Sequence, residues 1–295
     1  MKAALLPDRG VVKVAGDDAR RFLNGILTVD VPERAPGTAR YAALLTPQGK
    51  IIVDFLVTEA PAEDGGGFFL DCPKALAGGL VERLSFYKLR AKVMIEDLSA
   101  VLGVLAVWDG KAQSEYGLCY EDPRLAALGT RVMLPPHLGP EAAADLPASL
   151  VDADAYEAHR IALAIPRGGV DFIYGDTFPH EADMDQLGGI DFNKGCYVGQ
   201  EVVSRVEHRA TARSRVIAAT YDEFAPVPGT PVIAGEKSVG WIGSAAQGRA
   251  LALLRIDRVA DALANGTPLT AGGLTIRALK PSWARFELTA SKAAE

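Results

Sequence analysis

The side chains best suited to chemistry lie in one short stretch, residues 193–201, which reads Asn-Lys-Gly-Cys-Tyr-Val-Gly-Gln-Glu. Cys196 lies close to Lys194 and just ahead of a helical pattern that begins at Gln200. An ammonium group and a nearby helix start both favour the thiolate, which is the nucleophilic and metal-binding form of cysteine. Most free cysteines, however, are small buried core residues. On residue types alone, Cys196 is therefore either a reactive thiol or a core residue.

Two glycines flank this thiol, Gly195 and Gly199. Glycine allows positive φ and close approach of other groups, so we expect both to shape a tight turn that displays the thiol. Behind the turn, we expect Gln200, Glu201 and Arg205 to fasten it to the following helix.

A carboxylate interrupts an apolar strand elsewhere in the chain. Asp54 lies within the β-branched run 51–57, which forms a predicted hairpin with the run 41–45. Burying a carboxylate costs roughly several kcal/mol unless it is paired or meets a ligand. Alternation along the strand could equally place Asp54 on a solvated face, so both interpretations stay open. We expect this hairpin to be the partner of the cysteine turn.

Composition excludes several classes of protein. A net charge of -6 and a pI near 5.4 argue against a broad electrostatic surface for nucleic acid. No apolar run approaches the roughly 20 residues of a membrane span, and the N-terminal residues do not resemble a signal peptide. We therefore expect no nucleic-acid or membrane partner.

The cysteines and histidines show no metal-binding spacing. Three scattered cysteines indicate neither a disulfide framework nor a zinc site, so a reducing, cytoplasmic location is expected. Four dispersed histidines favour surface or core roles over metal ligation. The sequence therefore predicts no metal site.

The elements that must position these residues fall into two regions. Up to about residue 212, strands at 11–14 and 100–108 alternate with helical patterns at 16–26, 73–90 and 152–165, the last with Asp152 or Asp154 as its cap. After Arg215, turns rich in glycine separate six short strands, at 216–221, 231–234, 238–244, 250–256, 268–270 and 274–279. We therefore expect two domains, 1–212 and a β-barrel or sandwich at 213–295.

These residues resemble a known family. Lys194-Gly-Cys-Tyr-Val-Gly-Gln-Glu201 matches the K-G-C-Y-x-G-Q-E signature of the YgfZ-type folate-binding proteins, relatives of the glycine-cleavage T-protein, an aminomethyltransferase. The similarity extends over most of the chain, including the β-rich end. It implies an α+β, GcvT-like folate-binding fold of two intertwined halves around a central opening, followed by a C-terminal antiparallel β-barrel.

The resemblance also implies a function. The chain is expected to be a tetrahydrofolate-binding accessory protein for iron–sulfur cluster assembly or repair, with folate and iron–sulfur client or assembly proteins as partners. The resemblance implies that Cys196 is the functional thiol, and we expect it to make transient contact with an iron–sulfur cluster. The signature includes its neighbours Lys194, Gly195, Tyr197, Gly199, Gln200, Glu201 and Arg205.

Carried over residue by residue, the resemblance suggests a folate site. Asp54 falls on an aspartate that faces the reactive nitrogens of folate in T-protein, and Arg160 on a guanidinium of its R-L-E-A-G pattern. Glu181 lies in a segment of similar sequence, and a carboxylate suits the N–H donors of a pterin. The alternative function is a folate-dependent aminomethyltransferase or other one-carbon transferase; the resemblance favours an accessory protein over an enzyme.

Overall fold

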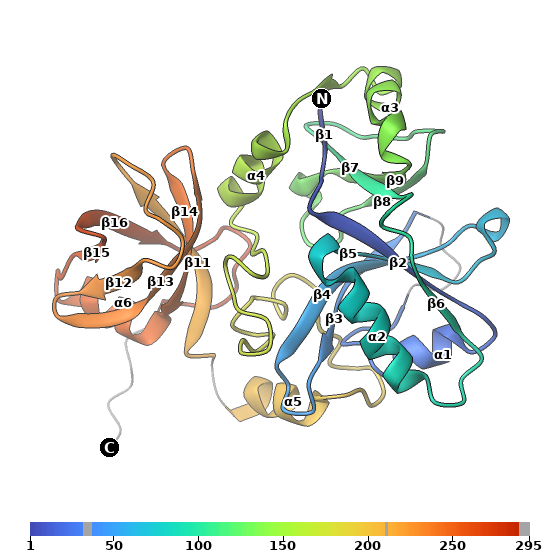
Figure 1. Cartoon of the computed structure of the whole chain (residues 1–295). Helices are drawn as coiled ribbons and strands as arrows, with labels where there is room; N and C mark the ends of the chain where they lie inside the picture. Colours follow the sequence, from blue (N-terminus) through green and yellow to red (C-terminus); the bar gives the residue numbers. More distant parts are fainter. Residues whose placement is uncertain (32–36, 210–211, 289–295) are drawn as a thin grey trace. The chain divides into compact units, whose positions relative to one another are not determined.

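The computed structural model describes residues 1–31, 37–209 and 212–288, which form two compact units (Figure 1). The first unit takes Met1–Tyr156 and Leu187–Gln200, and the second takes Glu157–Gln186 and Glu201–Glu295. Each unit therefore needs two separate stretches of the chain. The expected boundary between residues 212 and 213 stays a prediction.

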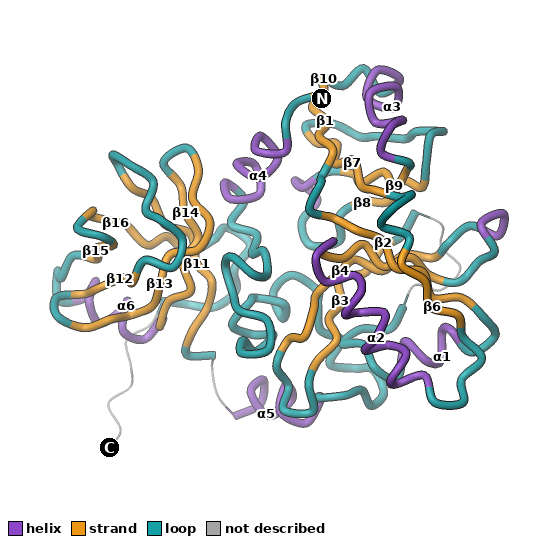
Figure 2. Tube along the Cα trace, viewed as in Figure 1, coloured by secondary structure: helices purple, strands orange, loops and turns teal. Residues whose placement is uncertain are grey.

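The first unit is built on two five-stranded sheets, drawn in orange in Figure 2. One has the strand order β10-β1-β7-β9-β8, in which β10 pairs parallel with β1 and the other pairs are antiparallel. The second has the order β3-β4-β5-β2-β6 and is fully antiparallel. The strands are β1 Lys2–Leu5, β2 Arg9–Ala15, β3 Ala39–Leu45, β4 Ile51–Glu59, β5 Phe68–Pro73, β6 Met94–Asp97, β7 Gly103–Trp108, β8 Leu118–Glu121, β9 Thr130–Leu134 and β10 Ser149–Leu150.

Helices cover these sheets with apolar side chains at helical spacing. Leu23 of α1 and Leu84 of α2 lie in one core with Phe55 of β4 and Leu70 of β5. The helices of this unit are α1 Ala19–Asn24, α2 Ala77–Lys88 and α3 Gly139–Asp145, with short 3-10 turns η1 Ala62–Asp64, η2 Lys74–Leu76, η3 Ala126–Leu128 and η4 Pro136–Leu138. The expected patterns at 16–26 and 73–90 thus contain helices, although each helix is shorter than its pattern.

The predicted hairpin is formed by β3 and β4. Its register places Ala43 opposite Asp54, and the backbone N–H of Thr46 donates to the carbonyl of Lys50 at 2.8 Å to close the turn. Gly49 takes φ +80° in this turn, a value that favours glycine.

The second unit contains a closed antiparallel barrel with the strand order β11-β14-β13-β12-β15-β16, in which β11 also pairs with β16 (Figure 1). Ile217, Ala252 and Ile276 lie in its buried core. The strands are β11 Ser214–Tyr221, β12 Pro231–Ala234, β13 Lys237–Ala246, β14 Arg249–Arg255, β15 Leu269–Ala271 and β16 Leu274–Leu279. All six expected strands are present, which confirms the predicted barrel.

Three further helices complete the chain: α4 Ala153–Ala162, α5 Gln200–Arg209 and α6 Ile256–Ala264. The expected cap of α4 is Asp152, whose Oδ1 accepts from the backbone N–H of Ala155 at 2.9 Å. Helix α6 was not expected; it buries Ile256 and Val259 in the barrel core. Among the described residues, no helix is long and apolar enough to cross a membrane.

Candidate functional site

The cysteine turn lies in the first unit, immediately before α5. Cys196 is exposed, whereas Cys72 is buried and Cys119 is half-buried. Burial raises the pKa of the Cys72 thiol to about 12 and raises that of Cys119 as well, which disfavours their thiolates. Of the three free thiols, the exposed one is therefore the most accessible to a partner.

Lys194 holds this turn against residues 24–30. Its side chain is fully buried, and Nζ donates to the carbonyls of Asn24 at 2.8 Å, Leu27 at 2.7 Å and Val29 at 3.1 Å. Asp30 lies 3.4 Å from the same ammonium group. Burial lowers the pKa of Lys194, and the nearby Asp30 carboxylate opposes this effect. The ammonium group therefore ties residues 24–30 to the turn, and its expected influence on the Cys196 thiol stays a prediction.

The two glycines of the turn differ in role. Gly199 takes φ +83°, and a Cβ there would lie 2.6 Å from the carbonyl oxygen of Thr46 and 3.1 Å from Cα of Gly49. The turn thus packs directly on the β3–β4 hairpin, which confirms the expected partner. Gly195 does not have positive φ, and apart from its two chain neighbours no heavy atom of the described residues lies within 4 Å of the place that a Cβ would take there. The expectation that both glycines are required by geometry is therefore wrong for Gly195.

The rest of the signature connects the turn to the core and to α5. Tyr197 is buried, which raises its pKa to about 12, and Nζ of Lys194 lies 5.2 Å from its ring centroid. The side chain of Gln200 accepts from the backbone N–H of Tyr197 at 3.4 Å. Glu201 and Arg205 form an exposed pair at 2.5 Å one turn apart on α5, the kind of pair that contributes little stability.

Asp54 is buried in β4, with 6 % of its surface exposed. The hydroxyl of Tyr41 on β3 donates to its Oδ2 at 3.0 Å. Burial and the Asp54 charge raise the pKa of Tyr41 well above its usual value, so this hydroxyl keeps its proton. Of the two open interpretations of Asp54, the structure therefore supports the buried one.

A charged network that sequence reasoning missed links the two sheets. Asp71 of β5 binds Arg9 at 2.6 Å and Arg131 of β9 at 2.7 Å. Arg131 also donates to Asp122 at 3.0 Å, and Arg124 donates to Asp122 at 2.7 Å. Burial raises the pKa of both carboxyls, but the guanidinium groups lower it by more, so the net shift of each pKa is downward and both carboxyls stay ionised. The one sequence signal for this network is the position of Asp71 in an apolar strand, because a carboxylate buried there needs a charged partner.

Arg160 of α4 lies buried in the second unit. Its Nε and Nη2 donate to the Glu157 carboxylate, Nη1 donates to Asp171 and to the carbonyl of Ile165, and Nη2 also donates to Ser244. All five N–H donors of a guanidinium are thereby used within the protein. The expected role of Arg160 in folate binding stays a prediction, and it would require one of these internal contacts to be exchanged for the folate carboxylate.

Glu181 lies in the same unit, in the loop before the cysteine turn. Its Oε2 accepts from the backbone N–H of Phe178 at 2.9 Å, and its carbonyl accepts from Val216 of β11 at 3.0 Å. The expected residues are thus divided: Asp54 and residues 194–200 belong to the first unit, whereas Arg160, Glu181, Glu201 and Arg205 belong to the second.

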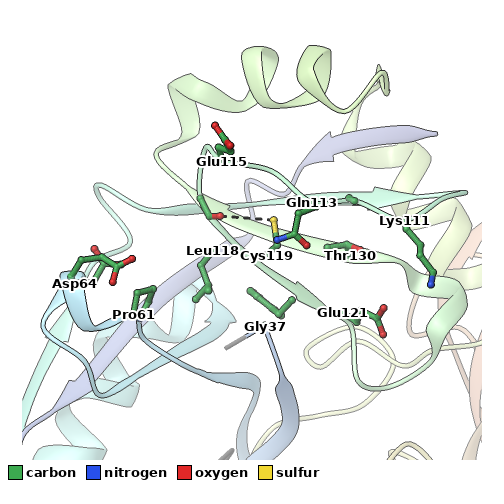
Figure 3. A pocket seen from close by; sticks show the side chains of 14 residues that line it. Gly37, Pro61, Asp64, Lys111, Gln113, Glu115, Leu118, Cys119, Glu121 and Thr130 are labelled. Carbon is green, nitrogen blue, oxygen red and sulfur yellow. Dashed lines mark hydrogen bonds between the residues drawn. The ribbon is translucent and has the colours of Figure 1, made fainter. Parts of the chain in front are cut away.

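A cavity of about 930 Å³ lies beside β8 in the first unit (Figure 3). Cys119 lines it, and the Sγ atom accepts from the backbone N–H of Ser114 at 3.2 Å. Glu63, Asp64, Glu115 and Glu121 contribute carboxylates to the lining, against one ammonium group from Lys111. Neither Asp54 nor Cys196 lines it, so this acidic cavity is separate from the cysteine turn.

Two family models match parts of the chain. The GCVT N-terminal domain matches residues 8–115, and the CAF17 C-terminal beta-barrel domain matches residues 213–286. The crystal structure of glycine cleavage system aminomethyltransferase T from Bartonella henselae superimposes with a TM-score of 0.73. It covers 95 % of this chain and 84 % of that one at 16 % identity. The predicted GcvT-like α+β fold with a C-terminal barrel is thereby confirmed.

Sequence relatives give a more specific likeness. The chain is 34 % identical over 228 residues to the mitochondrial iron–sulfur cluster assembly factor IBA57 homolog of Mycosarcoma maydis, covering 73 % of this chain and 56 % of the relative. It is 32 % identical over 254 residues to mitochondrial IBA57 of Mus musculus, covering 78 % and 68 %. The chain thus spans little more than half the length of the fungal relative. The expected YgfZ-type assignment stays a prediction.

The names of these relatives contradict the expected cytoplasmic location, because they are mitochondrial proteins. The expectation was wrong because it rested on cysteine usage, which reports a reducing environment rather than a particular compartment.

Proposed function

The chain belongs to the IBA57 family of iron–sulfur cluster assembly factors within the GcvT-like superfamily, and from this premise we propose that it is a tetrahydrofolate-binding accessory protein for iron–sulfur cluster assembly or repair. One observation carries the proposal. An exposed thiol, Cys196, lies on a turn that packs against the hairpin bearing the buried carboxylate of Asp54.

The thiol suits transient contact with a cluster or a client protein. A [4Fe–4S] cluster normally takes four cysteine ligands, and the other two thiols of this chain are buried or half-buried. Cys196 therefore supplies one ligand to a cluster whose other ligands come from a partner. The anchors at Lys194 and Gly199 keep the thiol at a defined position, which lowers the entropy cost of meeting that partner.

Asp54 suits the pterin of a reduced folate. A pterin carries adjacent N–H donors, and a buried carboxylate is a strong acceptor for them. Tyr41 orients the Asp54 carboxylate through its 3.0 Å hydrogen bond. The folate, when bound, supplies the one-carbon chemistry; the protein residues bind and orient it.

The first experiment separates the two roles of the site. In cells that depend on this protein, Cys196→Ser is expected to lose iron–sulfur enzyme activity, while the purified variant keeps the folate affinity of the wild type. Cys119→Ser is the matched control, because it removes another free thiol of the same unit. Full iron–sulfur enzyme activity with Cys196→Ser would refute the role of the thiol.

The second experiment tests the folate site by fluorescence titration with tetrahydrofolate. Loss of a hydrogen bond to a charged group costs about 1.5–3 kcal/mol, so Asp54→Asn is expected to weaken binding about 10- to 100-fold. Glu59→Gln removes a carboxylate from the same strand and is expected to bind as the wild type does. Equal affinities for the two variants would exclude Asp54 from the folate site.

A further inference from the structure

Three side chains of metal-binding type meet in the second unit, and none of them is among the residues assigned above to folate. They are His180, Asp185 and Glu207, and their ligand atoms all lie within 4.8 Å of one another. Nε2 of His180 lies 3.2 Å from a carboxylate oxygen of Glu207. We propose that these residues bind one divalent first-row transition-metal ion, such as Zn²⁺ or Mn²⁺, through one imidazole nitrogen and two carboxylate oxygens.

The distances between the three ligand atoms are close to those between the ligand atoms of a bound metal ion. Metal–nitrogen and metal–oxygen bonds of about 2.1 Å in a tetrahedron place ligand atoms about 3.4 Å apart. His180 and Glu207 already meet this separation at 3.2 Å. The widest pair, no more than 4.8 Å apart, needs to close by about 1.4 Å or less.

Two of the ligands are held in place before any metal binds. His180 is 2 % exposed, and its carbonyl oxygen accepts from Nη1 of Arg215 at 2.9 Å. The same guanidinium donates to both carboxylate oxygens of Asp185 at 2.9 Å. Arg215 thus fixes the backbone of one ligand relative to the carboxylate of the other. Such support around a metal site fixes ligand orientation and strengthens binding.

Asp185 retains acceptor capacity despite these contacts. Its Oδ2 accepts from Arg215 and from the side chain of Gln186, whereas Oδ1 accepts from Arg215. A carboxylate oxygen has about two acceptor positions, so among the described contacts Oδ1 keeps one for a metal. The Arg215 charge is shared between Asp185 and Asp183, whose Oδ1 accepts from Nη1 at 3.0 Å, so negative charge of the ligand carboxylates remains to balance the ion.

Glu207 gives the site access to solvent. It lies on α5, and its side chain is 41 % exposed, in contrast to the buried imidazole. Three protein ligands leave at least one coordination position open, which a water molecule or a partner's side chain can take. The ligand types favour Zn²⁺, Mn²⁺ or Fe²⁺, because Mg²⁺ and Ca²⁺ prefer oxygen ligands alone.

The test measures metal binding by the full chain and does not depend on the proposed iron–sulfur role. Because the exposed thiol can itself bind Zn²⁺, calorimetric titration uses the Cys196→Ser background, and Mn²⁺ binding is followed by electron paramagnetic resonance. We expect one saturable ion per chain in both titrations. In Glu207→Gln, an exposed substitution that keeps the side-chain shape, affinity is expected to fall at least about 10-fold for loss of a ligand.

Glu201→Gln is the matched control, because it removes the same charge from the same helix at a solvated position. It is expected to bind both ions as its parent does. The chemical shift of the His180 ring, followed by NMR, should change at a lower Zn²⁺ concentration in the control than in Glu207→Gln. Absence of saturable binding in the millimolar range, or equal affinity in the two glutamate variants, would overturn the proposal.

Discussion

Replacing Gly199 by alanine tests how the cysteine turn is held on the β3–β4 hairpin. Alanine at φ +83° costs about 1–2 kcal/mol relative to glycine, since Cβ approaches the following carbonyl oxygen. The new Cβ would also lie 2.6 Å from the carbonyl oxygen of Thr46, and relieving such overpacking costs about 1–3 kcal/mol. Together these terms predict that Gly199→Ala lowers the free energy of unfolding by about 2–5 kcal/mol.

The matched control is Gly195→Ala in the same turn. Beyond its chain neighbours, an alanine Cβ there meets no atom of the described part of the chain within 4 Å, and it needs no positive φ. The variant should therefore be neutral or more stable by up to about 1 kcal/mol, through the lower entropy of its unfolded chain. Thermal unfolding measures both variants. Each kcal/mol lost from the free energy of unfolding lowers the melting temperature by about 2–4 °C, so Gly199→Ala is expected to melt at least about 4 °C below the wild type. Equal melting temperatures for the two variants would refute this account of the turn.

Two further predictions concern buried charges. Lys194→Met removes three hydrogen bonds to buried or half-buried carbonyls and should lower the free energy of unfolding in urea by about 1–3 kcal/mol for each carbonyl left without a partner, whereas Lys2→Met, at an exposed position, should have no effect. Burial raises the pKa of Asp122 and the guanidinium groups of Arg124 and Arg131 lower it more, so the net shift is downward. The stability from this carboxylate is therefore present above its unfolded pKa of about 3.9 and is lost as the pH falls below it. Urea unfolding from pH 6 to pH 2 should show a smaller loss of stability for Asp122→Asn than for wild type, and parallel curves would contradict the pairing.

The barrel could be predicted from sequence because its strands are short and separated by turns rich in glycine. All six expected runs became strands, from β11 to β16. Helix α6 was missed because its apolar residues directly continue the run of β14, so no turn signal separates strand from helix.

The functional regions were predictable only where the information is local. The signature of residues 194–201 identified the turn, and the run around Asp54 identified the hairpin. The acceptors of Lys194 lie about 170 residues earlier in the chain. The ligand cluster of His180 and Glu207 joins a loop to a helix 27 residues later, so spacing between histidines and acids did not reveal it. For Gly195 the local information was misleading. A glycine beside a cysteine suggested a backbone that only glycine can adopt, but Gly195 does not have positive φ.

The position of Lys194 has a consequence for synthesis on the ribosome. Residues 24–30 are made well before residue 194 and receive their ammonium partner only when that residue has been made. At about 5–20 residues per second, the 170 residues between Asn24 and Lys194 take about 8–34 s. Throughout this interval the nascent first unit lacks residues 187–200. It therefore also lacks the hydrogen bond from the Thr28 hydroxyl to the carbonyl of Gly189. The turn that carries Cys196 can therefore take its described position only after these residues have been made.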